Sequence, residues 1–262
     1  MLLAIDIGNT NITAGVFAGD DGPERHWRLA TVREKTADEY GLTLSALMSS
    51  AGLDKKISGV VIASVVPRLS GTFRDAVSGY LGIKPVIAGE DAAIPVQTLV
   101  DRPEEVGADR LINALAAYHE HKTSLIIVDF GTAITFDYVT AEGKFAGGAI
   151  APGIGVSSQA LSSRAAKLPV VDFVKSAKIT GKNTVDAMRA GIYFGFAALT
   201  DGIIERMKKE NASDLKGVTP AKVVATGGMA GIIAGESRQI DVTDEFLTLK
   251  GLNIFFNKRG CK

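Results

Sequence analysis

The sequence contains very little cysteine and no excess of either charge, and both features exclude classes of protein. Cys261, near the C-terminus, is the single cysteine among 262 residues, so an internal disulfide framework and a cysteine-rich metal site are both excluded. Basic and acidic residues balance at 29 each, which leaves no overall basic field to attract nucleic acid. We therefore expect no nucleic-acid partner.

The N-terminus lacks a long apolar run. The run that starts at Met1 meets Asp6, well short of a signal-peptide core, and no basic residue precedes it. Hydrophobic residues make up 46% of the chain and charged residues 22%, as in ordinary globular proteins. These features predict a folded cytoplasmic protein with no membrane span. The histidines His26, His119 and His121 lack metal-ligand spacing, so we predict no metal site for them.

Predicted strands alternate with predicted helices, in an order typical of an α/β fold. The first half is predicted to contain strands 1–7, 12–18 and 24–31, then helix 36–52, strand 57–67, helix 69–82, strand 84–89 and helix 104–121. The first three strands are expected to be antiparallel. Thr36 is a predicted N-cap, and Glu39 completes a capping box with it.

The second half of the chain repeats this order. A strand pair is predicted over 124–140, with further strands at 143–153 and 221–228 and helices at 156–168 and 183–210. Asp6 and Asp129 follow matching apolar strands about half the chain apart. We interpret the repetition as a tandem duplication of one α/β unit, with a ligand in the cleft between the copies. The boundary is expected within residues 105–121.

The turn after the first strand is the first candidate binding site. Gly8 allows the backbone to reverse, so that the amides and side chains of Asn9, Thr10 and Asn11 could hold phosphate oxygens. An acid beside phosphates requires a cation between them, which makes Asp6 a candidate ligand on the Mg²⁺ side. The alternative is a simple hairpin turn, because Asp, Gly and Asn commonly form one.

A second turn repeats the pattern of the first. Asp129, Gly131 and Thr132 follow an apolar strand in the other half of the chain. Gly227 and Gly228 follow a third apolar strand, where a backbone without side chains could lie against the base and sugar of a nucleotide. Together these segments predict a nucleotide site.

Asp109 is a candidate proton acceptor. It lies in the first turn of the predicted helix 104–121, where the helix dipole stabilises an ionised carboxylate, and Arg110 beside it can bind an anion. A hydroxyl group that attacks a phosphoryl group needs such an acceptor. The alternative is that Glu104, Glu105 and Asp109 are only acids favoured at a helix N-terminus.

Five motifs carry a resemblance to the type III pantothenate kinases. They are "DIGNTN" at 6–11, "VGADR" at 106–110, "VDFGTAIT" at 128–135, "GGAIAPG" at 147–153 and "TGG" at 226–228. They occur in order over nearly the whole chain. That family is related to the superfamily of actin, sugar kinases and Hsp70. The resemblance implies an α/β fold of two tandem ribonuclease-H-like (actin-like ATPase) domains, 1–115 and 116–262, with the active site in the cleft between them.

The resemblance also implies the reaction, which is ATP-dependent phosphorylation of the 4'-hydroxyl of pantothenate, the first step of coenzyme A biosynthesis. The ATP-binding residues that it implies are Asp6, Ile7, Gly8, Asn9, Thr10, Asn11, Ile12, Thr13 and Thr132. The implied substrate-binding residues are Gly107, Ala108, Asp109, Arg110 and Thr184. Asp109 would be the catalytic base. Asp129 would hold a monovalent cation, K⁺ or NH₄⁺, beside a nucleotide that requires Mg²⁺.

The chain departs from the family pattern at Val100, where many members have a tyrosine, so a hydrogen bond to the substrate is expected to be missing there. The helix 183–210 is apolar almost all round and could form a dimer interface. The family is dimeric, so we expect a homodimer, with Thr184 of one subunit helping to complete the pocket of the other. The alternative to the kinase is a non-catalytic transcriptional accessory regulator of the same fold.

Overall fold

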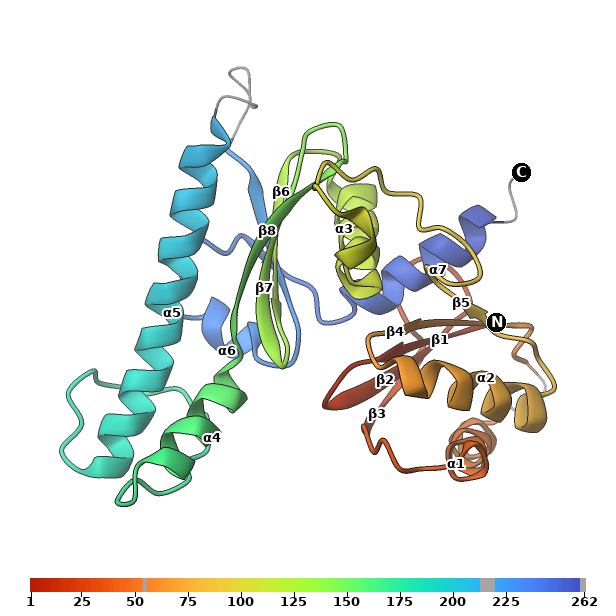
Figure 1. The fold of residues 1–262 in the computed structure, drawn as a ribbon, viewed down its shortest axis with the longest axis horizontal. Coiled ribbons are helices and arrows are strands. Elements are labelled where there is room, and N and C mark those ends of the chain that lie inside the picture. The colour runs from red at the N-terminus through yellow and green to blue at the C-terminus, as the bar shows by residue number, and fades with distance from the viewer. Residues whose placement is uncertain (54–55, 213–219, 260–262) are drawn as a thin grey trace. The chain divides into compact units, whose positions relative to one another are not determined.

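The computed structural model describes residues 1–53, 56–212 and 220–259 (Figure 1). Cys261 lies outside these ranges. The chain divides into two compact units. The first consists of Met1–Val96, Arg102–Ala116 and the segment from Phe246 onward, and the second consists of Gln97–Asp101 and Ala117–Glu245.

The first unit is built on a mixed five-stranded sheet in the order β3-β2-β1-β4-β5. β1, β4 and β5 are parallel, whereas β2 and β3 are antiparallel to their neighbours. Its elements are β1 Leu2–Ile7, β2 Asn11–Phe17, β3 Arg25–Ala30, α1 Ala37–Ser50, β4 Gly59–Ser64, α2 Pro67–Leu81, β5 Val86–Ile87, the 3-10 helix η1 Pro103–Glu105 and α7 Leu247–Arg259. Helix α3, Ala108–His121, begins in this unit and ends in the second.

The second unit has the same sheet topology. Its strand order, β10-β9-β6-β7-β8, is that of the first sheet when listed from the opposite edge, with β6, β9 and β10 parallel. Its elements are β6 Leu125–Phe130, β7 Ala133–Val139, β8 Phe145–Pro152, α4 Ile154–Arg164, α5 Thr184–Glu210, β9 Lys222–Thr226, α6 Ala230–Ala234 and β10 Val242–Thr243. The predicted duplication of an α/β unit is therefore confirmed.

The duplication extends to individual positions. β1 reads LLAIDI and β6 reads LIIVDF, and both are buried throughout except at the partly exposed acid in the fifth place. Those acids are Asp6 and Asp129. A strand that is buried on both faces reads as a continuous apolar run, so a carboxylate near its end is out of pattern. The exception at the same place in both halves marks a polar site at the end of each strand.

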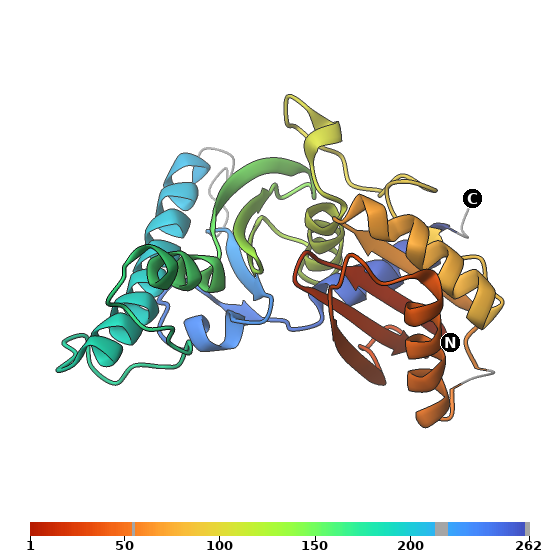
Figure 2. The same ribbon diagram turned by 60° about the horizontal axis from the view of Figure 1, so that its bottom comes forward.

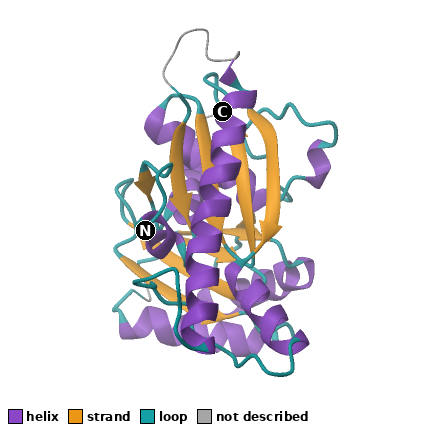
Figure 3. Cartoon of the chain, turned by 90° about the vertical axis from the view of Figure 1, so that its left-hand side faces the viewer, coloured by secondary structure: helices purple, strands orange, loops and turns teal. Residues whose placement is uncertain are grey.

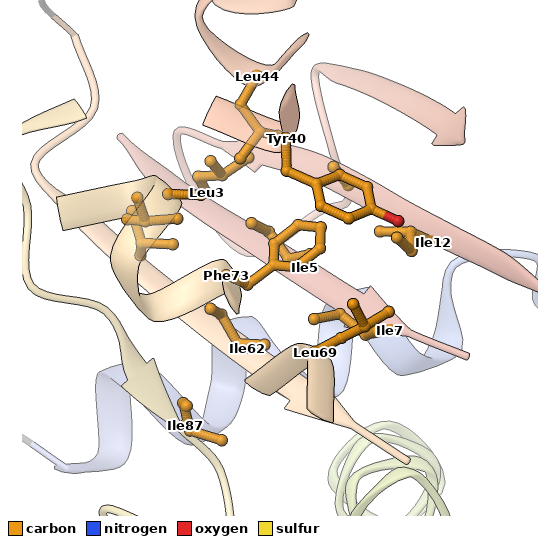
Figure 4. Close-up of a cluster of buried hydrophobic side chains, with 14 of the residues drawn as sticks. Leu3, Ile5, Ile7, Ile12, Tyr40, Leu44, Ile62, Leu69, Phe73 and Ile87 are labelled. Atoms are coloured by element: carbon orange, nitrogen blue, oxygen red, sulfur yellow. The ribbon is translucent and has the colours of Figure 1, made fainter. Parts of the chain in front are cut away.

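The first sheet has α1 and α2 on one face and α7 on the other (Figures 1 and 2). On one face Leu3 and Ile5 of β1 pack with Tyr40 of α1 and Phe73 of α2 (Figure 4). Successive strand residues point to opposite faces, so Leu2 and Ala4 belong to the other core. There they pack with residues of α7, namely Leu249, Leu252 and Phe255.

Helix α7 therefore belongs to the first unit, whereas the sequence predicts one C-terminal domain over 116–262. The change of unit after Ala116 lies next to the expected boundary. The segment from Phe246 through α7 was expected in the second unit and lies in the first. It returns because the second face of the first sheet needs apolar cover, which α7 supplies.

The second sheet buries one face against α4, α5 and α6. Val128 and Phe136 pack with Met188 and Ile192 of α5. Helix α5 is 27 residues long and runs in front of the strands in Figure 3. None of the helices in the described ranges is long and apolar enough to cross a membrane.

Several local predictions can be compared with the structure. The capping box of α1 is confirmed, since Thr36 Oγ1 accepts from Glu39 N at 3.3 Å and Glu39 Oε2 accepts from Thr36 N at 2.8 Å. The prediction of one helix over 104–121 was wrong at its start. Val106 is extended, with ψ near 121°, so it separates η1 from α3. Helix α6, strand β10 and helix α7 were not predicted.

Candidate active site

The turn between β1 and β2 forms the first part of the candidate site. A hydrogen bond of 3.0 Å from Gly8 N to Asn11 O closes it. Asn9, Thr10 and Asn11 are exposed, and Asp6 is partly buried. The hairpin turn and the phosphate loop are therefore not exclusive interpretations, because the turn closes and still presents its polar side chains to solvent.

Two of the predicted ATP-binding residues point into the core. Ile7 and Ile12 face each other across β1 and β2, and both are 0% exposed. They can offer only backbone groups to a ligand. Asp6 and Thr13, the adjacent pair in the ladder, are partly exposed and point to the opposite face.

The residues around Asp109 lie at the same end of the first sheet as the turn. β1 and β4 are parallel, with Ile7 beside Ser64, and Val65 N donates to Ile7 O at 3.1 Å. A Cβ atom added at Gly107 would lie 3.9 Å from Cγ1 of Val65. The predicted phosphate turn and the substrate segment thus lie near the carboxyl ends of parallel strands, where open α/β sheets bind ligands.

Asp109 is partly buried in the first turn of α3. Burial raises its pKa above the ordinary value, and this outweighs the lowering by the hydrogen bond from Arg110 N, 2.8 Å long, and by the charge of Arg110. The helix dipole favours the ionised form, as the sequence predicts, but desolvation of the carboxyl group is the largest effect on its pKa in the structure. A carboxylate with a raised pKa accepts a proton more readily near neutral pH.

The other acids near Asp109 have different surroundings. Glu104 and Glu105 lie in η1 and are exposed, and Glu105 forms an ion pair of 2.7 Å with Arg102. Both are thus acids in the first turn of a short helix, as the alternative describes, whereas Asp109 lies in the first turn of α3 and is partly buried. Gly107 precedes α3, and a Cβ atom there would collide with Oδ1 of Asp109. The glycine thus allows the carboxylate to fold back over the helix start.

In the second unit, Asp129 lies in a row with two threonines. It pairs with Thr135 on β7 and with Thr226 on β9, and paired residues of neighbouring strands point to the same face. A Cβ atom at Gly227 would approach Oδ1 of Asp129 to 2.6 Å and the backbone N of Phe130 to 2.7 Å. Because the φ angle of Gly227 is also +90°, no other residue fits there without strain.

Thr132 occupies the exposed turn between β6 and β7. Gly131 N donates to Ala133 O at 3.1 Å, and Gly153 N donates to Thr132 O at 3.1 Å. A Cβ atom at Gly153 would collide with that oxygen. The backbone around Thr132 is thus held from both sides, whereas its side chain is exposed.

Thr184 has a different position within the second unit. It is the first residue of α5, which packs on the face of β6 that carries Val128, while Asp129 points to the other face. The exposed Thr184 lines an apolar groove of about 670 Å³ between α4 and α5. Other residues of the groove are Leu161, Leu168, Met188, Ile192, Phe196 and Leu199.

The carboxylates limit how a metal could be held. Within residues 1–53, 56–212 and 220–259, no group of three or more His, Cys, Asp or Glu side chains could bind one. Mg²⁺ in kinase sites is commonly held by one or two carboxylates together with phosphates and water, and Asp6 fits that pattern. Asp129 lies in one row with Thr135 and Thr226, and the Thr135 hydroxyl donates to Oδ2 of Asp137 at 3.2 Å, so this row offers oxygen atoms of the kind that bind cations.

Comparison with known proteins adds the family. The model of the type III pantothenate kinase family matches residues 2–206. The chain belongs to the type III pantothenate kinase family. The type III pantothenate kinase of Geotalea daltonii is 48% identical over 259 residues, with 98% of each chain covered. That of a Geobacillus species is 46% identical over 263 residues, with 100% of this chain and 99% of the relative covered.

Solved structures share the fold at low identity. A Campylobacter jejuni protein described as a Baf family transcriptional activator aligns with a TM-score of 0.60 and 18% identity, covering 99% of this chain and all of the other. A ROK family glucokinase from Streptomyces griseus, in complex with glucose and AMPPNP, aligns with a TM-score of 0.50 and 14% identity, covering 98% and 99%. Likeness at these identities shows the fold alone. Together with the two sheets of matching topology, these neighbours confirm the α/β fold predicted from the sequence.

Several residues near the site were given no role in the predictions from sequence. Thr135 and Thr226 lie inside quoted motifs but were given no role, although their places beside Asp129 follow from strand pairing. The proximity of Val65 to the Gly107 segment carried no sequence signal, because the two are distant in sequence. The family model covers four of the five quoted motifs, all except TGG at 226–228.

Proposed function

We propose that this chain transfers the γ-phosphoryl group of ATP to the 4'-hydroxyl of pantothenate, with Asp109 as the base. Membership of the family supports the reaction. The observation that carries the assignment of residues is the approach of two segments in one unit. Val65 N donates to Ile7 O at the end of β1, next to the phosphate turn, and Cγ1 of Val65 lies 3.9 Å from where a Cβ atom on Gly107 would be, in the segment that carries Asp109. A phosphate-binding turn beside a poised carboxylate is the minimum that phosphoryl transfer requires.

The bond changes follow from these groups. The hydroxyl oxygen of pantothenate attacks the γ-phosphorus, the bond from that phosphorus to the bridging oxygen breaks, and ADP leaves. The carboxylate of Asp109 takes the hydroxyl proton and later releases it to water. Its raised pKa supports this role, because the best base has a pKa closer to the working pH than an ordinary aspartate. Arg110 next to it is suited to bind the carboxylate of pantothenate.

ATP is proposed to bind to the turn that follows β1 and to Thr132. The exposed side chains of Asn9, Thr10 and Asn11 offer neutral donors, and the backbone of Ile7 and Ile12 fixes the ends of the turn. These groups are set by the sheet before ligand binds, so little reorganisation is needed. The amide of Gly8 is committed to Asn11 O, so the phosphates are expected to use the other groups of the turn.

Kinases of this family act with ATP and need a divalent metal. We propose Mg²⁺ beside Asp6, and K⁺ or NH₄⁺ beside Asp129, Thr135 and Thr226. When bound, these ions neutralise the charge that develops on the transferring phosphoryl group. A location in the cytoplasm remains a prediction from composition.

A coupled ADP-release assay tests the proposed function directly. Purified protein is given ATP, Mg²⁺ and pantothenate, in buffers that contain K⁺, NH₄⁺ or Na⁺ alone. Turnover that depends on pantothenate is expected. Folded protein without turnover in any of these salts would support the non-catalytic regulator instead.

Val100 offers a prediction about substrate affinity. It lies on the segment that hydrogen bonds to β8, and its Cγ1 is 3.6 Å from a Cβ atom placed on Gly147. The change Val100→Tyr would add the hydroxyl that many relatives have. We expect the KM for pantothenate to fall about 2- to 10-fold, the value of one neutral hydrogen bond, with kcat little changed. Val100→Phe is the control, since it adds the ring alone; equal KM values for the two variants would contradict the prediction.

We propose a homodimer formed through the α4–α5 groove, with a second copy of the chain as occupant. The groove is apolar, and Gly191 and Gly195 are exposed one turn apart on α5 beside Phe196. Glycines four residues apart let another helix approach closely. Thr184 also lines this groove. Because α5 covers the face of the sheet away from Asp129, Thr184 is better placed to serve the pocket of a neighbouring subunit than that of its own.

Substitution of Gly191 tests the dimer. A Cβ atom at Gly191 meets nothing within 4 Å, so Gly191→Glu leaves the packing of a single copy intact. A charge buried against a second apolar surface is costly, so we expect the protein to elute as a monomer and to lose pantothenate affinity. Light scattering with size exclusion gives the mass. Gly231→Glu on α6, whose Cβ position is equally open, should leave the dimer unchanged. A monomeric wild type, or a dimeric Gly191→Glu variant, contradicts the proposal.

A further inference from the structure

Arg33 lies against the proposed phosphate turn, and none of the motifs includes it. Its Nη2 atom donates to Oδ1 of Asn9 at 3.0 Å, and the side chain is exposed. A guanidinium group has five N–H donors, and the hydrogen bond to Asn9 uses one of them. The group can therefore bind Asn9 and an anion at the same time.

The chain just before Arg33 is fastened to the same turn by Thr31. Thr31 N donates to Thr10 O at 3.0 Å, and Thr31 Oγ1 donates to Gly8 O at 2.7 Å. Both bonds begin one residue after the end of β3. These two hydrogen bonds fix the backbone just before Arg33 relative to the turn.

Val32, between Thr31 and Arg33, is hydrogen-bonded to a side chain of the core. Val32 N donates to Oη of Tyr40 at 3.0 Å, and the same hydroxyl donates to Val32 O at 2.9 Å. Tyr40 is 1% exposed, and its ring centroid is 4.5 Å from that of Phe73 (Figure 4). A rigid aromatic side chain therefore fixes the residue before Arg33. The backbone before Arg33 is thus fixed by hydrogen bonds to the turn and to the core, which keeps the guanidinium group near the turn.

The positive charge of Arg33 complements the anionic ligand of the proposed site. The turn itself carries one carboxylate, Asp6, and neutral side chains, whereas the phosphate chain of a nucleotide is strongly anionic. Arginine presents a planar set of donors that matches two phosphate oxygens. We propose that Arg33 binds the phosphate chain of the nucleotide alongside the turn. This inference rests on the proposed function, because that function puts the nucleotide at the turn.

The alternative interpretation is that Arg33 is a surface residue whose one hydrogen bond contributes almost nothing to ATP binding. Calorimetric titration with ATP and with adenosine separates the two readings, because only ATP carries phosphates. With Arg33→Gln, we expect the Kd for ATP to rise about 10- to 100-fold, the value of one lost charge-assisted contact, and the Kd for adenosine to stay unchanged. Arg33→Lys should restore part of the ATP affinity, since it keeps the charge and loses the planar fork.

Matched variants make the test specific. Arg25→Gln removes an exposed arginine at the start of β3, the strand that precedes Arg33, and should leave both affinities unchanged. Tyr40→Phe keeps the packed ring and removes the hydroxyl that anchors Val32, so we expect a smaller rise in the Kd for ATP, with adenosine again unaffected. Thermal unfolding confirms that each variant is folded.

The outcomes distinguish this inference from the proposed function. An ATP Kd for Arg33→Gln within twofold of the wild type, or an equal loss of ATP and adenosine affinity, overturns the role of Arg33. Wild-type protein that binds ATP and fails to phosphorylate pantothenate overturns the proposed function, while the comparison of ATP affinities still decides the role of Arg33. Wild-type protein that binds no ATP overturns both.

Discussion

Asp109→Asn should lower the turnover of pantothenate by about 10²- to 10⁴-fold, the usual contribution of a positioned base. The amide keeps the size of the carboxylate, and its oxygen can still accept from Arg110 N, so the start of α3 should not change. Because the substitution removes only the proton acceptor, pantothenate should still bind. The measurements are kcat from ADP release and the Kd of pantothenate from calorimetry. Unchanged turnover would remove Asp109 as the base.

The same variant should be more stable than the wild type at neutral pH. Burial raises the pKa of Asp109 in the folded state, so ionised Asp109 destabilises the fold at pH values above that pKa. The penalty disappears below about pH 4, where the group is protonated in both folded and unfolded chains. We therefore expect a higher Tm for Asp109→Asn at pH 7 and an equal Tm at low pH. Glu104→Gln, an exposed neighbour, is the control for both turnover and Tm.

Asp129→Asn should remove stimulation by potassium. The carboxylate is the formal charge of its row with Thr135 and Thr226, whereas the neighbouring carboxylate of Asp137 already accepts from Thr135 Oγ1, so a neutral amide at position 129 should attract a monovalent cation much less. We expect turnover in K⁺ to fall about 10²-fold, similar to the loss of one electrostatic stabilising group, and to match turnover in Na⁺. ADP release over a range of K⁺ concentrations gives the dependence.

The exposed acid Asp172 in the same unit provides the control, since Asp172→Asn changes the net charge equally and should keep the full response to K⁺. A variant of Asp129 that is still stimulated by K⁺ as strongly as the wild type would move the cation site elsewhere. Loss of activity in every salt without loss of the K⁺ to Na⁺ ratio would point to a general structural effect of the substitution.

Much of the fold could be predicted because its signals are local. A strand such as Leu2–Ile7 is apolar throughout except at Asp6, and the repetition of this pattern at Leu125–Phe130 identifies the duplication. The N-cap at Thr36 follows from two residues three positions apart. The return of α7 to the first unit could not be predicted, because it depends on which sheet face lacks apolar cover after the rest of the chain has folded.

The candidate site was predictable in part for similar reasons. Residues in short motifs, such as Gly8 and Asn9, were found because their types suit a tight phosphate-binding turn. Arg33 and Val65 were not, since their roles depend on contacts across the fold. The direction of the pKa shift of Asp109 was also beyond the sequence, because a helix start favours ionisation while burial opposes it, and only the structure shows which is larger.

The return of α7 has a consequence for biosynthesis. The ribosome releases β1 through β5 long before α7, and until then the apolar side of that sheet formed by Leu2, Ala4 and Val61 is without Leu252 and Phe255. The second unit, in contrast, is one nearly continuous stretch from Ala117 to Glu245. The nascent chain can therefore complete the later half first, and the half that begins with the N-terminus is finished last.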